Sequence, residues 1–282
     1  MIPTLIFDLE TIPDIKSIRR LYNLDETLSD FDLVNIANFK RRQKVGHDFL
    51  PVHLHQVVAI SCVLKTDDRL EVWTLGDEGT DEAGILKHFF EGLDKYSPNL
   101  VSWNGSGFDL PVLNYRMLAN KISSEIYFDT GENHSEFKWN NYMSRYHRRH
   151  LDLMDTLAMF NGRNNASLNE ICKIYGFPGK LDMDGGKVWE TFLNGDLASI
   201  RNYCETDVAN TYLVFLRYLL SKKELTSIDI PAHKKQKGRL GLNNTLLLAV
   251  IILLATNLAY MTITNQDKGT VISQIVAEHP VW

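Results

Sequence analysis

Four acidic residues and one tyrosine have the types and the spacing that could support chemistry. Asp8 and Glu10 stand two residues apart at the end of the apolar run TLIFDLET, so on a β-strand both side chains leave the same face. Tyr203 and Asp207 stand four residues apart in RNYCETDV, so on a helix they lie one turn apart on one face. Asp109 follows the loop NGSGF, whose glycines permit a close approach of the backbone. Three separate elements therefore carry acids that could converge.

Converging carboxylates are the ligands that Mg²⁺ and Mn²⁺ prefer. Two such ions, about 3.5–4 Å apart, clamp the attacking and leaving oxygens of an in-line phosphoryl displacement. A tyrosine on the helix of the fourth acid would then face the phosphate and hydrogen-bond the attacking water. Each acid alone also has an ordinary structural explanation, because Asp8 and Glu10 fit an exposed strand end and Asp109 fits a helix cap.

Other catalytic motifs do not fit the chain. A haloacid-dehalogenase phosphatase needs an aspartate where this sequence has Glu10. The segment NGSGFD lacks the third correctly spaced glycine of a dinucleotide-binding fingerprint, and the sequence contains no GxSxG elbow and no HExxH helix. These classes of enzyme are therefore excluded.

The elements that must position these residues follow from the periodicity of the chain. After the first strand, residues 56–65 and 69–75 predict a hairpin, and residues 81–96 predict an amphipathic helix. The later segments predict strand, loop and helix over 99–118, a strand or strand-to-helix segment over 150–160, and helices over 167–177, 187–196 and 196–220. Early strands with helices between and after them indicate an α/β domain with a mixed sheet.

Composition limits the class of protein. The 282 residues carry a net charge of −5 and have no broadly basic domain, so contact with nucleic acid is predicted to be local. Cys62, Cys172 and Cys204 are scattered, which argues against a disulfide framework or a structural zinc and fits a reducing compartment. The first ten residues predict a strand, not a signal peptide, since they have no basic leader.

Three motifs in order resemble those of a known family. FDLET at 7–11, NGSGFDLPVL at 104–113 and YCETD at 203–207 are similar to the three motifs of the DEDD superfamily of 3′–5′ exonucleases. The chain resembles the tyrosine branch, because Tyr203 precedes the last aspartate by four residues and Asn202 stands where the other branch has histidine. HLDLMDTLAMF and FPGKLDMDGGKVW are similar to the stand-alone bacterial group called polymerase-B-like 3′–5′ exonucleases.

The resemblance implies a ribonuclease-H-like, three-layer fold over residues 1–220, with a mixed β-sheet flanked by helices. It implies two Mg²⁺ or Mn²⁺ ions, with Asp8 bridging both. Glu10 and Asp207 would complete the inner shell of one ion, and Asp109 would hold the second, partly through water. Tyr203 would orient the nucleophilic water.

The implied activity is metal-dependent 3′–5′ hydrolysis of single-stranded DNA or mismatched duplex ends. Thr11 and Phe108 occupy positions that help seat the 3′-terminal nucleotide in the family, and Asn104 is either a further substrate contact or a loop-structuring residue. Two alternatives stay open. One is a 3′–5′ exoribonuclease of the same fold, and the other is a non-catalytic scaffold that binds nucleic acid or is tethered to a membrane.

Basic and aromatic residues near the third quarter of the chain are candidates for contact with the strand. In RYHRRH at 145–150, Arg145 and Arg148 stand beside Tyr146, a combination that suits single-stranded nucleic acid or, alternatively, a solvated loop. KRRQK at 40–44 is interpreted as a solvated helix face.

Two further pairs of polar residues lie outside the three motifs. His53 and His55 precede a strand and are interpreted as loop packing rather than metal ligands. Asp152 and Asp155 fall near the expected site, and Asp155 is a candidate for supporting a ligand or replacing one.

The C-terminal segment 246–263 is hydrophobic on every helical face and, with its flanks, reaches the roughly 20 residues that span a bilayer. The basic run at 233–239 would keep the preceding chain in the cytoplasm. We therefore expect a basic linker over 221–243, a transmembrane helix over 244–264 and a short tail over 265–282, with the catalytic domain anchored to the inner membrane. A buried helix is the alternative.

Overall fold

The computed structural model describes residues 2–67, 69–179 and 183–224. The expected membrane segment, 244–264, lies outside the described residues, as do most of the linker and the tail. Within the part of the chain that is described, none of the helices combines the length and the apolar character needed to cross a bilayer.

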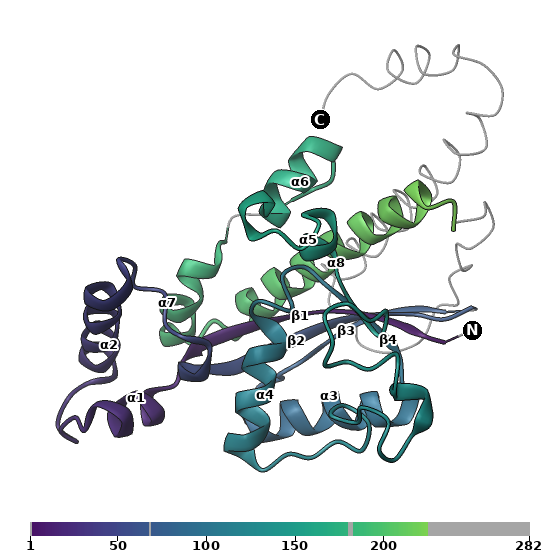
Figure 1. Cartoon of the computed structure of the whole chain (residues 1–282). Helices are drawn as coiled ribbons and strands as arrows, with labels where there is room; N and C mark the ends of the chain where they lie inside the picture. Colours follow the sequence, from purple (N-terminus) through teal and green to yellow (C-terminus); the bar gives the residue numbers. More distant parts are fainter. Residues whose placement is uncertain (1, 68, 180–182, 225–282) are drawn as a thin grey trace.

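A five-stranded mixed sheet forms the centre of the molecule (Figure 1). Its strand order is β3-β2-β1-β4-β5, with β1 pairing antiparallel to β2 and parallel to β4. The strands are β1 (Thr4–Pro13), β2 (His55–Lys65), β3 (Leu70–Leu75), β4 (Asn99–Ser102) and β5 (His150–Asp152). The predicted hairpin of β2 and β3 and the predicted mixed sheet are both confirmed.

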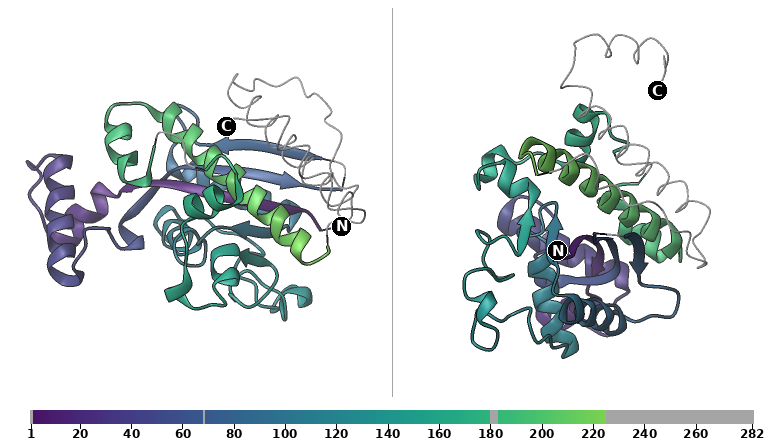
Figure 2. Two further views of the ribbon diagram at one scale, coloured as in Figure 1. Left: turned by 90° about the horizontal axis from the view of Figure 1, so that it is seen from above. Right: turned by 90° about the vertical axis from the view of Figure 1, so that its right-hand side faces the viewer.

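Helices cover both faces of the sheet and make a three-layer, ribonuclease-H-like α/β fold (Figures 1 and 2). On one face α3 (Glu82–Tyr96) and α4 (Asp109–Asn120) share a core with β1 and β2, and on the other α6 (Leu168–Tyr175) and α8 (Leu197–Ser221) share a second core. The remaining helices are α1 (Ile15–Tyr22), α2 (Asp30–Val45), α5 (Leu153–Leu157) and α7 (Val188–Leu193), with short 3₁₀ turns η1 (Val52–Leu54), η2 (Ser135–Phe137), η3 (Gly162–Asn164) and η4 (Gly185–Lys187).

Local sequence explains where the helices begin and end. Ser167 caps α6 in a capping box with Glu170, and Gly176 ends the helix in the left-handed conformation, as predicted. Asp196 caps α8 by accepting a hydrogen bond from the Ser199 N–H.

The two faces of β1 separate its side chains. Phe7 and Leu9 pack in the core beneath α3 and α4, whereas Ile6 packs in the core beneath α8. Because side chains alternate along a strand, Asp8 and Glu10 project on the α8 side. β1 pairs with β4 only over residues 4–6. Beyond Ile6 this edge of β1 has no partner strand among the described residues and is open to the loop between β4 and α4.

The pairing of β1 with β2 shifts register directly after Glu10. Glu10 lies opposite Ala59, but Thr11 lies opposite Val57, so β2 carries one extra residue at this point. A bulge of this kind bends the strand and redirects the side chains that follow. The carboxylate of Glu82, at the start of α3, accepts the Val57 N–H at 2.7 Å and fixes the irregular pairing.

A buried ion group joins the end of β1 to the helices below the sheet. Arg116 on α4 donates to Glu82 at 2.8 Å and also pairs with Asp14, which caps α1. Removing one partner of such a buried group typically costs about 3–5 kcal/mol, because it leaves a charge without its counterion. The end of the strand that carries Asp8 and Glu10 is thus held by α1, α3 and α4 together.

Candidate active site

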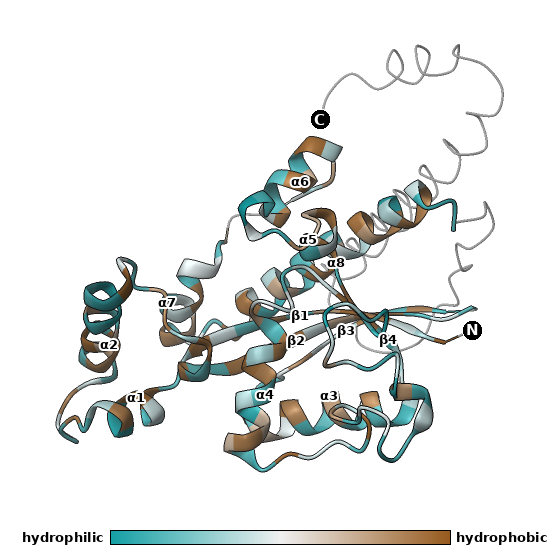
Figure 3. Cartoon of the chain, in the orientation of Figure 1, coloured by the Kyte–Doolittle hydropathy of each residue, from teal (hydrophilic) through white to brown (hydrophobic). Residues whose placement is uncertain are grey.

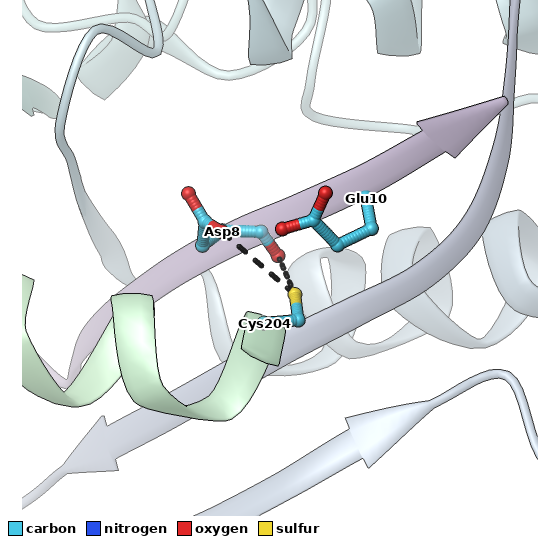
Figure 4. Close-up of side chains that lie close together, drawn as sticks. All are labelled: Asp8, Glu10 and Cys204. Atoms are coloured by element: carbon cyan, nitrogen blue, oxygen red, sulfur yellow. Dashed lines mark hydrogen bonds between the residues drawn. The ribbon is translucent and has the colours of Figure 1, made fainter. Parts of the chain in front are cut away.

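Asp8 and Glu10 lie side by side on β1 and face the helix α8 (Figure 4). Their carboxylate oxygens and the Sγ atom of Cys204 all lie within 4.8 Å of one another. The predicted convergence of the first two acids on one face of a strand is therefore present. Asp109 and Asp207 lie outside this close group of three ligand atoms.

Cys204 was not predicted from the sequence as part of the site. Its thiol lies 3.4 Å from the main-chain oxygen of Asp8 and 3.8 Å from Oδ2 of the same residue. Burial, and then the charges of Asp8 and Glu10, raise the pKa of this thiol well above its usual range. Cys204 is therefore an S–H donor that supports Asp8, and no spacing rule for metal ligands or catalytic acids would have singled it out.

Tyr203 and Asp207 lie one turn apart on α8, and both side chains are buried. The pKa of Tyr203 is raised chiefly by burial, next by the charges of Asp207, Glu10 and Asp8, and also by a hydrogen bond with Asp207. The phenol thus lies among three of the four predicted acids. The expectation that this helix directs both side chains to the space above β1 agrees with these interactions.

Asp109 is the first residue of α4 and not its cap, because Phe108 holds the cap position without a side-chain hydrogen bond. Burial raises the pKa of Asp109 to about 7, and the charge of Asp152 adds to the rise. Hydrogen bonds from its own N–H and from the N–H of Leu9 act in the opposite direction. Leu9 separates Asp8 from Glu10, so Asp109 reaches β1 between the other two acids, along the edge that β4 leaves free.

Asp152 organises the loop that delivers Asp109. Its carboxylate accepts hydrogen bonds from the N–H groups of Asn104 at 3.0 Å, Ser106 at 2.9 Å and Asp155 at 3.2 Å. The sequence analysis predicted that Asp152 lies near the site but did not predict that it holds this loop. The role could have been inferred from the position of a carboxylate at the end of a neighbouring parallel strand. Asn104 adopts a left-handed conformation with φ 66°, which fits its loop-structuring alternative, and its contact with substrate stays a prediction.

Thr11 and Phe108 meet around His55 at the end of β1. Nε2 of His55 lies 3.1 Å from the carbonyl of Leu50, which can only accept, so Nε2 carries the proton of the neutral ring. Nδ1 is then the acceptor for the Thr11 hydroxyl at 2.8 Å. Burial lowers the pKa of His55 and favours this neutral form. Phe108 packs edge-on against the same ring, with centroids 5.2 Å apart.

The ring of His53 packs against Tyr115, in agreement with its predicted role in packing, whereas His55 begins β2 with both ring nitrogens hydrogen-bonded. The predicted substrate contacts Arg145 and Arg148 are both exposed. Arg145 forms an ion pair with Asp155 at 2.5 Å, and a role of Asp155 in supporting or replacing a metal ligand stays a prediction.

The donor set fits a hard divalent cation. Carboxylate oxygens of Asp8 and Glu10 converge, and the charges of Asp8, Glu10 and Asp207 reach the same phenol. Like charges gathered in a buried space repel one another unless a cation lies among them, and Mg²⁺ and Mn²⁺ favour such oxygen ligands.

The fold and this site define a nuclease-like α/β protein whose acids suit metal-dependent phosphoryl chemistry. Residues 47–240 match the family described as a predicted 3′–5′ exonuclease related to the exonuclease domain of PolB, and the chain belongs to this family. The matched segment includes Asp109, Tyr203 and Asp207 and begins after Asp8 and Glu10. A search of curated proteins gave no match.

Proposed function

We propose that this protein removes nucleotides from the 3′ end of single-stranded DNA by metal-dependent hydrolysis. The observation that carries the proposal is the gathering of Asp8, Glu10 and Asp207 around the phenol of Tyr203. This constellation stands in a chain whose family is described as a predicted 3′–5′ exonuclease. The assignment to the tyrosine branch of DEDD exonucleases is part of the same proposal.

The metal ligands in this proposal are Asp8, Glu10, Asp109 and Asp207. Two Mg²⁺ or Mn²⁺ ions bound there would neutralise phosphate charge and lower the pKa of a bound water. Asp109 belongs to α4 and Asp207 to α8, two helices that pack on opposite faces of the sheet. Helices that are fixed to the strand by buried contacts hold such ligands better than loops do.

Tyr203 orients the attacking water in this proposal. Its hydrogen bond with Asp207 directs the phenolic proton to the carboxylate, which leaves the lone pairs of the phenol oxygen to accept a hydrogen bond from water. The raised pKa keeps the phenol protonated at neutral pH, so Tyr203 positions the water and does not act as its base.

Thr11 and Phe108 seat the terminal nucleotide in the same proposal. The Thr11 hydroxyl donates to His55, so toward a substrate it can only accept a hydrogen bond. A 3′-hydroxyl is a donor that would fill this role. Phe108 directly precedes Asp109 in the chain, and its ring can contact the terminal sugar or base.

A single gel assay tests the proposed function. The full-length chain is incubated with Mg²⁺ or Mn²⁺ and with 5′-labelled single-stranded DNA and RNA of one sequence, and Asp8→Ala is the control. We expect a ladder that shortens from the 3′ end, requires metal, is stronger on DNA, and is absent from the control. Stronger cleavage of RNA would replace DNA with RNA as the substrate, and no cleavage of either strand would refute the nuclease.

We also propose that the chain is held at a membrane through residues 244–264. The support is the hydrophobic character of 246–263 in the sequence and the basic run before it. Fractionation of cells that express the full-length chain would show it in the membrane pellet, resistant to washing with high salt. Recovery in the supernatant would contradict the anchor without affecting the proposed chemistry.

A further inference from the structure

The helix α2 presents a polar and aromatic stripe beyond the carboxyl end of β1. With α1 it stands to one side of the sheet, as Figure 1 and the left view of Figure 2 show. Its core face is buried against α1 through Leu33 and Ala37. On another face, at spacings of four, three and four residues, lie Phe31, Asn35, Asn38 and Arg42, which we call the α2 stripe. Phe31 is 63% exposed, although it is a large apolar side chain.

The α2 stripe leads to the candidate active site through Phe49. Arg42 pairs with Asp48 at 2.7 Å, and the next residue, Phe49, is 56% exposed. The ring of Phe49 lies 5.7 Å from that of Phe108 and 5.2 Å from that of His55, measured between centroids. Since Phe108 directly precedes Asp109, exposed side chains continue from α2 to the edge of the site.

The position of the Phe49 backbone is fixed from the same helix. Nε of Arg41 donates to the carbonyl of Phe49 at 3.1 Å. Together with the pair between Arg42 and Asp48, this bond ties the segment after α2 to the last turns of the helix. The exposed ring is therefore held at a set place between the α2 stripe and Phe108.

The chemistry of this surface suits a single nucleic-acid strand. The last two turns of α2 and the segment to Phe49 contain four cations, Lys40, Arg41, Arg42 and Lys44, and one acid, Asp48, in a chain whose net charge is −5. The upper, C-terminal turns of α2 are coloured as hydrophilic in Figure 3. Exposed aromatic rings stack on bases, guanidinium groups bind phosphates and asparagines hydrogen-bond both. The core of a protein–protein interface is depleted of charged residues, lysine among them, whereas this surface carries four cations.

We propose that the α2 stripe and Phe49 bind the single strand on the 5′ side of the nucleotide being removed. Phe49 stacks on a base next to the one seated by Phe108, and Arg42 contacts a phosphate farther along the strand. The inference rests on the proposed function, since it assumes that the 3′ end lies at the acids on β1. It also assigns a role to the basic run at 40–44 that the sequence alone interprets as solvated.

The test compares strand lengths. Hydrolysis of a trinucleotide and of a strand of about 12 nucleotides is measured for the full-length chain, Phe49→Ala and Arg42→Gln. Only the longer strand reaches the α2 stripe. We expect Phe49→Ala to lower kcat/KM about fivefold or more for both strands, because both contain the base next to the terminal one, and Arg42→Gln to lower it for the long strand alone. Arg42→Gln should reduce the slope of log KM for the long strand against log salt by about 0.7.

Asp48→Asn is expected to strengthen binding of the long strand, the opposite of the effect of Arg42→Gln. It removes the carboxylate that pairs with Arg42 and leaves the guanidinium group to the phosphate, so the long strand should bind more tightly. A merely structural role for the pair predicts weaker binding or no change. The matched control is Lys95→Gln with Tyr96→Ala, which removes an exposed cation and aromatic ring at the far end of α3.

Two results would overturn the inference. One is that Arg42→Gln changes kcat/KM of the long strand and of the short strand by the same factor. The other is that Phe49→Ala and Arg42→Gln lower kcat/KM for the long strand no more than the α3 control does. Binding of a 5′-fluorescent strand is measured in parallel by anisotropy. If no protein hydrolyses the strand but Phe49→Ala loses binding, the proposed function is contradicted and the proposed strand-binding surface is supported. Failure of the function and failure of the binding surface are therefore distinguishable.

Discussion

The thiol of Cys204 on α8 lies 3.4 Å from the main-chain oxygen of Asp8 on β1. The same sulfur lies 3.8 Å from the carboxylate of that residue. Two elements that are almost 200 residues apart in the chain thus meet directly behind the first predicted metal ligand. The contact is a hydrogen bond from a buried thiol, and it orients the carboxylate toward the space shared with Glu10.

A hydroxyl group should replace this thiol without loss of function. We expect Cys204→Ser to retain metal-dependent hydrolysis, because serine donates to Asp8 as cysteine does, and Cys204→Ala to lose about 1 kcal/mol of unfolding free energy. Thermal unfolding and steady-state rates check both. A thiolate-to-cobalt charge-transfer band in the Co²⁺-loaded chain, absent from Cys204→Ser, would contradict this role and make Cys204 a metal ligand.

The loop that delivers Asp109 requires glycine at position 105. A Cβ atom there would lie 2.1 Å from Oγ and 2.7 Å from Cβ of Ser102, so Gly105→Ala forces the loop to move. We expect it to lower the rate of hydrolysis at least tenfold, comparable to loss of a group that supports a metal ligand. The control is Gly92→Ala on α3, where a Cβ meets no atom within 4 Å. That change should raise stability by up to about 1 kcal/mol, and an equal effect of both variants on the rate would contradict the account.

His150 makes the fold sensitive to acid. Its ring is buried against the Ser102 hydroxyl at 2.8 Å, and burial lowers its pKa to about 4. Between pH 6.5, the usual pKa of histidine, and pH 4 the unfolded chain binds more protons than the folded protein does. The contribution of His150 to stability is therefore complete above pH 6.5 and is lost as the pH falls through about 4. Urea unfolding of His150→Gln should show a dependence on pH in this window that is weaker by up to about 1.4 kcal/mol per pH unit. An unchanged slope would contradict the assignment.

Asp109 should couple stability to metal. Its pKa is raised to about 7, so its contribution to stability is present below its ordinary value of 3.8 and is lost as pH rises through about 7. In EDTA at pH 8, Asp109→Asn should therefore unfold at a higher temperature than the unchanged chain, because the variant lacks a buried charged carboxylate. Each kcal/mol of this cost that is removed should raise the unfolding temperature by roughly 2–4 °C. Added Mg²⁺ should stabilise the unchanged chain more than the variant. Equal stabilisation of both would exclude Asp109 from the metal site.

Local pattern was sufficient to predict most of the elements and the faces on which the paired acids and the tyrosine lie. The spacing of Asp8 and Glu10 on a strand, and of Tyr203 and Asp207 on a helix, determines which faces they share, because strand and helix periods are fixed by the backbone. The cap at Ser167 and the end at Gly176 are likewise local. These features depend on residues within one or two turns of each other, and the structure has them where they were predicted.

The supporting residues could not be predicted in the same way. Cys204 meets Asp8 only because α8 crosses β1, and Asp152 holds Asn104 only because β5 lies beside β4. The bulge after Glu10 depends on a carboxylate from α3. Each of these contacts joins residues that are distant in the sequence, and no spacing rule carries that information.

The most direct test of the central claim compares two aspartates on the same helix. Asp207 lies beside Tyr203 in the buried site, whereas Asp196 is the exposed cap of α8. Asp196→Asn retains the cap, because asparagine caps helices about as well as aspartate. Tyr203→Phe, which keeps all four acids, serves as an intermediate and should lower the rate about 10- to 100-fold.

The measurement is the rate at which a 5′-labelled single strand shortens in Mg²⁺. We predict that Asp207→Asn lowers this rate by well over about 100-fold while the protein stays folded, and that Asp196→Asn leaves it close to that of the unchanged chain. A folded Asp207→Asn protein that shortens the strand as fast as Asp196→Asn does would contradict the account.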